Sequence, residues 1–137
     1  MVSTKGRYAL RTMIDIARNS NGNYVPLKDI SKREDISMKY LEQVTSLLVK
    51  AKLLTGLRGS KGGYKLVKDV NQYTTLEIIE AMEGTVAPVQ CLKDKENKCT
   101  RCGICTTIDF WQGFDEVVKG YLSNVTLEQL VLNANKK

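Results

Sequence analysis

The sequence contains no histidine, two prolines, one tryptophan and no long apolar run. Histidine is the commonest general base and metal ligand, so its absence disfavours Ser-His or Cys-His nucleophiles and ordinary hydrolytic catalysis. No uninterrupted apolar run exceeds three residues, whereas a transmembrane helix needs ~18 and a signal-peptide core ~7. We therefore expect a cytoplasmic protein that is not an enzyme and has no membrane partner.

The charge is distributed unevenly over the 137 residues. Residues 1–68 hold 14 Lys and Arg against 5 Asp and Glu, a net charge of +9, and residues 69–137 hold 7 against 10, a net charge of −3. Clustered Lys and Arg bind polyanions because they displace counterions from phosphates. The first half of the chain is thus a candidate nucleic-acid-binding surface.

Three helices are predicted in this basic half. Apolar residues recur at helical spacing over residues 4–20, and Pro26 suits the start of a second helix over residues 27–34. Ser37 is a good N-cap for a third helix that reaches about residue 50. Two helices joined by a short turn near Asp35 have the dimensions of a helix-turn-helix over residues 27–50.

Two short apolar runs around a glycine-rich turn follow, which predicts a β-hairpin over residues 53–67. A hairpin directly after a helix-turn-helix is the layout of a winged helix. The wing would place Arg58 and Lys61 at a thin tip that suits a minor groove.

The third helix leaves Met38, Lys39, Glu42, Gln43 and Ser46 facing outward, and Glu42 could accept a hydrogen bond from a cytosine amino group. The predicted DNA-binding residues are Ser37, Lys39, Tyr40, Glu42, Gln43, Arg58, Ser60 and Lys61.

The rest of the chain completes a mostly α-helical fold with one hairpin. Thr74 and Glu77 form a capping box for a helix that ends near Gly84. Residues 85–106 show no periodicity, a long helix follows over about 107–122, and a last helix starts at Thr126. We expect three segments: a winged helix-turn-helix domain (1–84), a cysteine-rich loop (85–106), and a dimerisation helix with a C-terminal helix (107–137). A small domain with one recognition helix usually binds a palindrome as a twofold dimer.

All four cysteines lie in the loop, at Cys91, Cys99, Cys102 and Cys105. Three of them at intervals of two intervening residues can wrap an iron–sulfur cluster, with a more distant fourth completing the set. Structural zinc and free redox-active thiols are the alternatives. The spacing favours an iron–sulfur cluster and leaves both the 2Fe–2S and the 4Fe–4S type open.

Together, several motifs make the chain resemble the Rrf-type family of bacterial winged-helix regulators, in particular its iron–sulfur-binding members. They are Ser3-Thr4-Lys5-Gly6-Arg7-Tyr8-Ala9, Val25-Pro26-Leu27, Asp29-Ile30-Ser31, Tyr40-Leu41-Glu42-Gln43, Arg58-Gly59, Gly62-Gly63-Tyr64 and Thr126-Leu127-Glu128. The resemblance implies that Glu42 discriminates between operator classes and that Arg58 enters the minor groove.

The same resemblance implies a 2Fe–2S cluster held by three cysteines and one histidine. The cysteines correspond to Cys91, Cys99 and Cys105, but the histidine position is Ile108, which cannot be a ligand. We hypothesise that Cys102 supplies the fourth ligand, and all-thiolate ligation should lower the cluster's reduction potential.

The expected function is a DNA-binding transcriptional regulator that senses iron–sulfur status through a cysteine-ligated cluster, and two alternatives remain. One is a repressor of cysteine metabolism from the same family, controlled by a partner enzyme or thiol redox without metal. The other is a small electron-transfer protein, for which the basic half, the wing and Glu42 would have no purpose.

Overall fold

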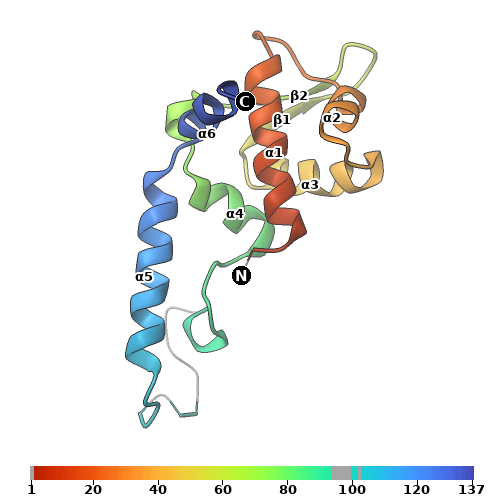
Figure 1. Cartoon of the computed structure of the whole chain (residues 1–137). Coiled ribbons are helices and arrows are strands. Elements are labelled where there is room, and N and C mark those ends of the chain that lie inside the picture. Colours follow the sequence, from red (N-terminus) through yellow and green to blue (C-terminus); the bar gives the residue numbers. More distant parts are fainter. Residues whose placement is uncertain (1, 94–99, 102) are drawn as a thin grey trace.

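The computed structural model describes residues 2–93, 100–101 and 103–137. In this part of the chain six α-helices accompany one two-stranded antiparallel hairpin, so the expected fold class is confirmed (Figure 1). In chain order the elements are α1 (Thr4–Asn19), α2 (Leu27–Glu34), α3 (Met38–Lys50), β1 (Leu54–Leu57), β2 (Gly63–Leu66), the 3-10 turn η1 (Val70–Gln72), α4 (Thr75–Glu83), the 3-10 turn η2 (Gln90–Leu92), α5 (Ile108–Asn124) and α6 (Leu127–Asn135).

Helix α1 is the centre of the fold. It begins where the Ser3 side chain accepts a hydrogen bond from the Lys5 backbone, and it buries Ala9, Met13 and Ile16 on one stripe at helical spacing. It contacts α2, α3, α4, α6 and β2. We call α1–α4, the hairpin and α6 the body.

Helices α2 and α3 form the predicted helix-turn-helix. The turn contains Asp35 in the left-handed conformation with φ 53°, and Ser37 caps α3 by accepting from the Tyr40 backbone at 3.2 Å. A bidentate ion pair fixes α2 to α1: Arg33 donates to the two carboxylate oxygens of Asp15 at 2.8 and 2.9 Å. This hydrogen bonding to Asp15 raises the pKa of Arg33 above its usual value.

The hairpin pairs Leu54 with Leu66 and Leu57 with Gly63. Its second strand is joined to the chain before α2 by a bridge in which Val25 and Tyr64 exchange backbone hydrogen bonds of 2.8 and 2.9 Å. Gly63 has φ 148°, and a Cβ there would lie 2.2 Å from the Val25 carbonyl oxygen. Only glycine allows this close approach, which fixes the wing to the body.

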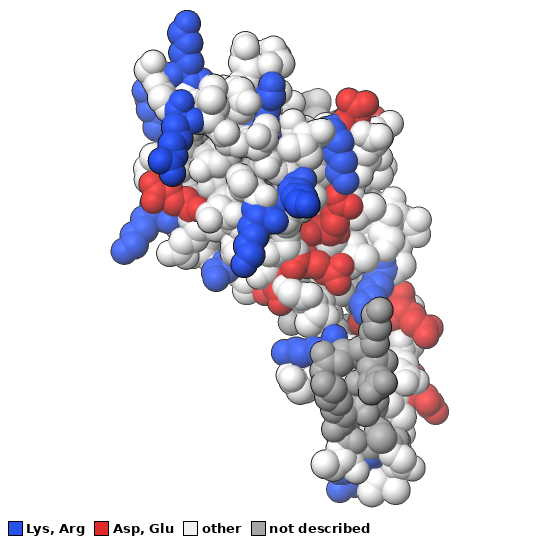
Figure 2. All heavy atoms as spheres, turned by 180° about the vertical axis from the view of Figure 1, so that it is seen from behind, with Lys and Arg blue, Asp and Glu red and all other residues white. Residues whose placement is uncertain are grey.

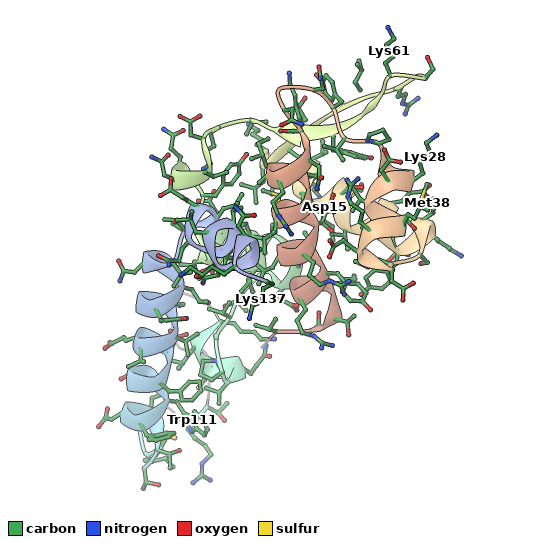
Figure 3. All side chains as sticks on the ribbon, turned by 45° about the horizontal axis from the view of Figure 1, so that its top comes forward. Asp15, Lys28, Met38, Lys61, Trp111 and Lys137 are labelled. Carbon is green, nitrogen blue, oxygen red and sulfur yellow. The ribbon has the colours of Figure 1, made fainter. Side chains whose placement is uncertain are left out.

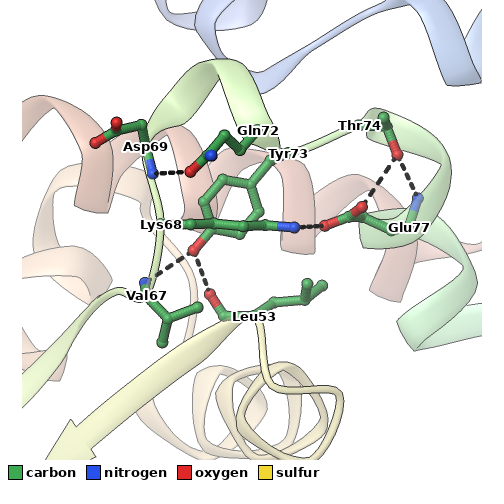
Figure 4. A network of polar contacts seen from close by, with 8 residues as sticks. All are labelled: Leu53, Val67, Lys68, Asp69, Gln72, Tyr73, Thr74 and Glu77. Atoms are coloured by element: carbon green, nitrogen blue, oxygen red, sulfur yellow. Dashed lines mark hydrogen bonds and ion pairs between the residues drawn. The ribbon is translucent and has the colours of Figure 1, made fainter.

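Tyr73 holds the base of the wing (Figure 4). Its buried hydroxyl donates to the Leu53 carbonyl at 2.8 Å and accepts from the Val67 backbone at 2.9 Å. Lys68 lies over the Tyr73 ring and pairs with Glu77 at 2.7 Å. Half of the predicted capping box of α4 is observed: the Thr74 hydroxyl accepts from the Glu77 backbone at 3.2 Å, while the Glu77 carboxylate accepts from the Thr74 hydroxyl at 3.4 Å.

The two helices of segment 107–137 lie in different parts of the molecule. Helix α5 extends away from the body together with η2, at the end opposite the wing (Figure 1), and we call these two elements the projection. The chain then returns through a bridge between Thr74 and Thr126, and α6 packs against α1 with Leu127 fully buried in the core. None of the described helices has the length and hydropathy needed to span a membrane.

Candidate nucleic-acid interface and cysteine segment

A groove of about 1090 Å³ separates α3 from the wing. One wall is the α3 stripe of Met38, Glu42, Ser46 and Val49, at positions i, i+4, i+8 and i+11 of the helix. The other wall runs from Gly56 to Ser60 and from Gly62 to Tyr64, and the start of α2 closes one end. Figure 3 shows Lys28, Met38 and Lys61 around this side of the molecule.

The outward face predicted for α3 is observed: Met38, Lys39, Glu42, Gln43 and Ser46 are all exposed. Their roles differ by position, because Met38, Glu42 and Ser46 line the groove, whereas Lys39 and Gln43 lie outside its lining. The carboxylate of Glu42 therefore shares the groove with the backbone of the wing.

Two of the predicted DNA-binding residues also build the start of the helix. Ser37 is the N-cap, and the half-buried Tyr40 ring packs edge-on against Tyr8 with centroids 5.2 Å apart. This contact ties α3 to α1 and leaves only part of Tyr40 available to a ligand.

The wing tip carries Arg58, Ser60 and Lys61, all exposed. Gly59 has φ 111° and its carbonyl accepts from the Gly62 backbone at 3.0 Å, so the tip is a tight turn. A Cβ at Gly62 would lie 2.1 Å from the Leu57 carbonyl oxygen, which excludes a side chain there. The turn presents two cationic side chains at a narrow, protruding end.

The basic character expected for the first half of the chain appears on the surface. On the face in Figure 2 most Lys and Arg side chains lie on the body, and few lie on the projection. Lys28 at the start of α2 lines the groove and was not among the DNA-binding residues predicted from the sequence. A lysine in the first turn after Pro26 was the available signal, because helix N-termini attract phosphate.

Two of the four cysteines lie within the described residues. Cys91 lies in η2 and Cys105 lies three residues before α5, and both are half-exposed free thiols. The Cys105 sulfur is 3.6 Å from the Thr107 hydroxyl, and hydrogen bonding from Thr107 lowers the pKa of Cys105. Cys99 and Cys102 lie outside the described residues.

The donor set decides which cofactor these residues fit. Thiolates are soft ligands that select iron–sulfur clusters, zinc and Cu(I), and a lowered thiol pKa favours the ligating form. Ile108, at the position where the family resemblance implies histidine, is the half-buried first residue of α5 and offers no ligating atom. Within residues 2–93, 100–101 and 103–137 no three His, Cys, Asp or Glu side chains converge as a metal site.

The fold and the groove define a winged helix-turn-helix DNA-binding protein. Residues 2–133 match the Rrf2 family, described as iron-dependent transcriptional regulators, and the chain therefore belongs to this family.

The similar proteins include regulators named IscR and a regulator named CymR. The chain is 40% identical to the HTH-type transcriptional regulator IscR of Cronobacter sakazakii over 132 residues, covering 96% of this chain and 80% of that protein. Among solved structures, it is similar to CymR, the global cysteine regulator of B. subtilis (35% identity, TM-score 0.78, 97% of both chains). It is also similar to T. potens IscR (29% identity, TM-score 0.76, 98% of this chain and 88% of that one). These relatives are regulators, in agreement with the predicted class and against the electron-transfer alternative.

Proposed function

We propose that this transcriptional regulator works as a cytoplasmic homodimer on a palindromic operator, with α3 of each copy in a major groove and the wing in the adjoining minor groove. The observation that carries the proposal is the groove between α3 and the wing, where Glu42 and Arg58 line opposite walls. The space between a recognition helix and a wing suits the phosphate strand that separates the two grooves of the duplex.

Each predicted residue then has a chemical role. Glu42 accepts from a cytosine amino group, and Lys39 and Gln43 reach base edges or phosphates beside it. Arg58 and Lys61 bring positive charge to the minor groove, with the Ser60 hydroxyl as a phosphate donor. Ser37 and Tyr40 set the position of the first turn of α3.

Selection from a randomised DNA duplex library tests this interface. Glu42→Ala should lose base preference at one position of the selected sequence, a change of ~1–3 kcal/mol, because the cytosine amino group loses the carboxylate that accepts its hydrogen bond. Lys61→Ala should weaken binding to all sequences alike and reduce the salt slope by about 1. Equal and sequence-independent losses for both variants would contradict the assignment.

For the sensing site, we propose an iron–sulfur cluster bound by Cys91, Cys99, Cys102 and Cys105, of the 2Fe–2S type. The support is the donor set: four thiols within 15 residues, a Cys105 whose pKa is lowered, and no histidine in the chain. A bound cluster supplies a group whose occupancy follows iron supply and oxidants. Cys105 lies directly before α5, so ligation there would restrain the start of that helix and bias the dimer geometry.

Anaerobic reconstitution followed by iron and sulfide analysis, absorption and Mössbauer spectroscopy tests the cofactor. Equal iron and sulfide with 2Fe–2S parameters would support the proposal, and a 4Fe–4S spectrum or zinc alone would refute the cluster type. Cys102→Ala should lose the wild-type spectrum, with Cys91→Ala as the positive control. A Cys102→Ala protein that kept the spectrum would refute this ligand.

The similarity to B. subtilis CymR supports a second candidate, a cysteine-metabolism repressor controlled by a partner enzyme or by thiol redox without metal. The two functions differ in a single measurement. The metal-free protein should change its operator affinity on reconstitution if the cluster is the signal. An affinity that stays constant on reconstitution and changes on thiol oxidation would favour the second candidate.

A further inference from the structure

Met38 is an exposed methionine at the first position of α3. Its exposed fraction is 41%, and it lies outside the hydrophobic core. It lines the groove between α3 and the wing, and its side chain lies on the same side of the molecule as Lys28 (Figure 3). An exposed apolar side chain in this groove is available for contact with an apolar group of a ligand.

The position matters because recognition helices contact base edges mainly through their N-terminal residues. The apolar group that a base edge offers in the major groove is the C5-methyl of thymine. Methionine suits such a contact, because its unbranched, polarizable side chain adapts to an irregular surface. Lys28 is on the same side of the groove and can hold the adjoining phosphate.

The spacing of Met38 and Glu42 along α3 predicts how far apart on the operator the two bases that they contact lie. Met38 and Glu42 both line the groove and are four residues apart, so they lie one helical turn apart on one face. A turn rises ~5.4 Å and successive bases of one strand are ~3.4 Å apart. One turn therefore corresponds to one or two base pairs.

We infer that Met38 reads the C5-methyl of a thymine that lies within two base pairs of the cytosine read by Glu42. This inference rests on the proposed function, because it requires α3 in the major groove. It adds a specificity determinant to the recognition helix and predicts a thymine beside the cytosine in each half-site.

Val49 serves as the matched control. It lies on the same face of α3, is 38% exposed and lines the same groove, but it stands three turns from the N-terminal end. Its position directs it away from the base edges that the first turn of the helix meets.

The experiment uses the duplex that the full chain selects from a randomised library, measured by fluorescence anisotropy. Each thymine is replaced in turn by deoxyuridine, which removes only the methyl group. At one position near the cytosine, wild-type binding should weaken by about fourfold per substituted thymine, the equivalent of ~0.8 kcal/mol for one methyl-sized group. At this position a G·5-methylcytosine pair should bind more tightly than a G·C pair, which assigns the effect to the methyl.

Three protein variants, each measured with both duplexes, complete the test. Met38→Ala should bind the thymine and deoxyuridine duplexes equally, and Met38→Leu should retain most of the discrimination. Val49→Ala should keep the wild-type ratio between the affinities for the two duplexes, whatever its overall affinity. Alanine is the best helix former, so Met38→Ala should fold, and its melting temperature checks this.

The failures are distinguishable. If no sequence is enriched, the proposed function itself fails, and the inference with it. If a sequence is enriched but no deoxyuridine substitution weakens the wild type, or if Met38→Ala keeps the sensitivity, only the inference is overturned.

Discussion

The body and the projection differ in how completely they bury their apolar surface. The body contains fully buried side chains from α1, α3, α4 and α6, including Met13, Leu41, Ile78 and Leu127. Helix α5 has no buried residue, and Phe110, Val117 and Tyr121 are 64%, 74% and 68% exposed. A folded monomer rarely leaves such an apolar face in water. The body thus buries its apolar side chains within one chain, whereas α5 leaves an apolar face uncovered, which is the face that the proposed homodimer would cover.

The largest effect should come from a charge on that face. Val117→Glu places a carboxylate at the most exposed apolar residue of α5, and a twofold interface repeats the change on both copies. An unpaired buried charge costs several kcal/mol, so we expect self-association to weaken at least about a hundredfold, ~3 kcal/mol. Sedimentation equilibrium measures this.

Ser123→Glu adds the same charge to an exposed position of α5 outside the apolar stripe and should leave the dimer intact. If Val117→Glu also remained dimeric, the second copy would not cover this face.

The next largest effect should come from the buried ion pair between Asp15 and Arg33 within the body. Asp15→Ala should lower the free energy of unfolding by about 2–3 kcal/mol, because it removes a carboxylate that is 2% exposed and leaves Arg33 without its partner. Urea denaturation of the metal-free protein measures the loss in the free energy of unfolding. Arg33 is itself 39% exposed, so water recovers part of the cost.

Glu34→Ala is the matched comparison, since Glu34 pairs with Arg11 across the same two helices but nearer the solvent. Its expected loss is below about 1 kcal/mol. Equal losses in the free energy of unfolding for the two variants would show that the burial of Asp15 does not strengthen its ion pair.

The smallest effect should appear at the junction of the two regions, where α4 ends at Glu83. Burial alone would raise the pKa of Glu83, but hydrogen bonds from the Ser3 hydroxyl and backbone N–H outweigh it and lower this pKa below its usual value. The folded pKa is lower than the unfolded one, so the stabilisation is complete above the unfolded pKa of ~4.3 and is lost as the pH falls through the folded pKa.

Glu83→Gln should therefore cost about 1 kcal/mol or less at pH 7, and the difference from wild type should shrink at acidic pH. Thermal melts at several pH values measure it. Glu80→Gln removes a charge from the same helix without removing the Ser3 hydrogen bonds. A pH-independent cost of Glu83→Gln would contradict the role of its charge.

The local elements could be predicted because their signals are local. Pro26 before α2, the Ser37 cap of α3, the Thr74 cap of α4 and the Thr126 cap of α6 each act within four residues, and all appear in the structure. The outward face of α3 followed from helical period in the same way. The candidate DNA-binding residues of the wing could be placed at its tip for the same reason.

Contacts between distant residues could not be read from these patterns. Nothing local to Asp15 indicates Arg33, and the pairing of Val25 with Tyr64 depends on the path of the wing. Lys28 had a local signal in its place after Pro26, but its position in the groove depends on where α2 lies relative to α3 and the hairpin.

The basic half, the helix-turn-helix with its wing, the four grouped cysteines and the missing histidine follow from the order of the amino acids alone, because composition, period and spacing are properties of neighbours along the chain. Three features become visible only in the folded chain: Met38 and Glu42 share a groove with the wing, α6 returns to the body, and α5 projects with an uncovered apolar face. Those features arise when segments far apart in the chain bury surface against one another, and burial depends on the whole fold.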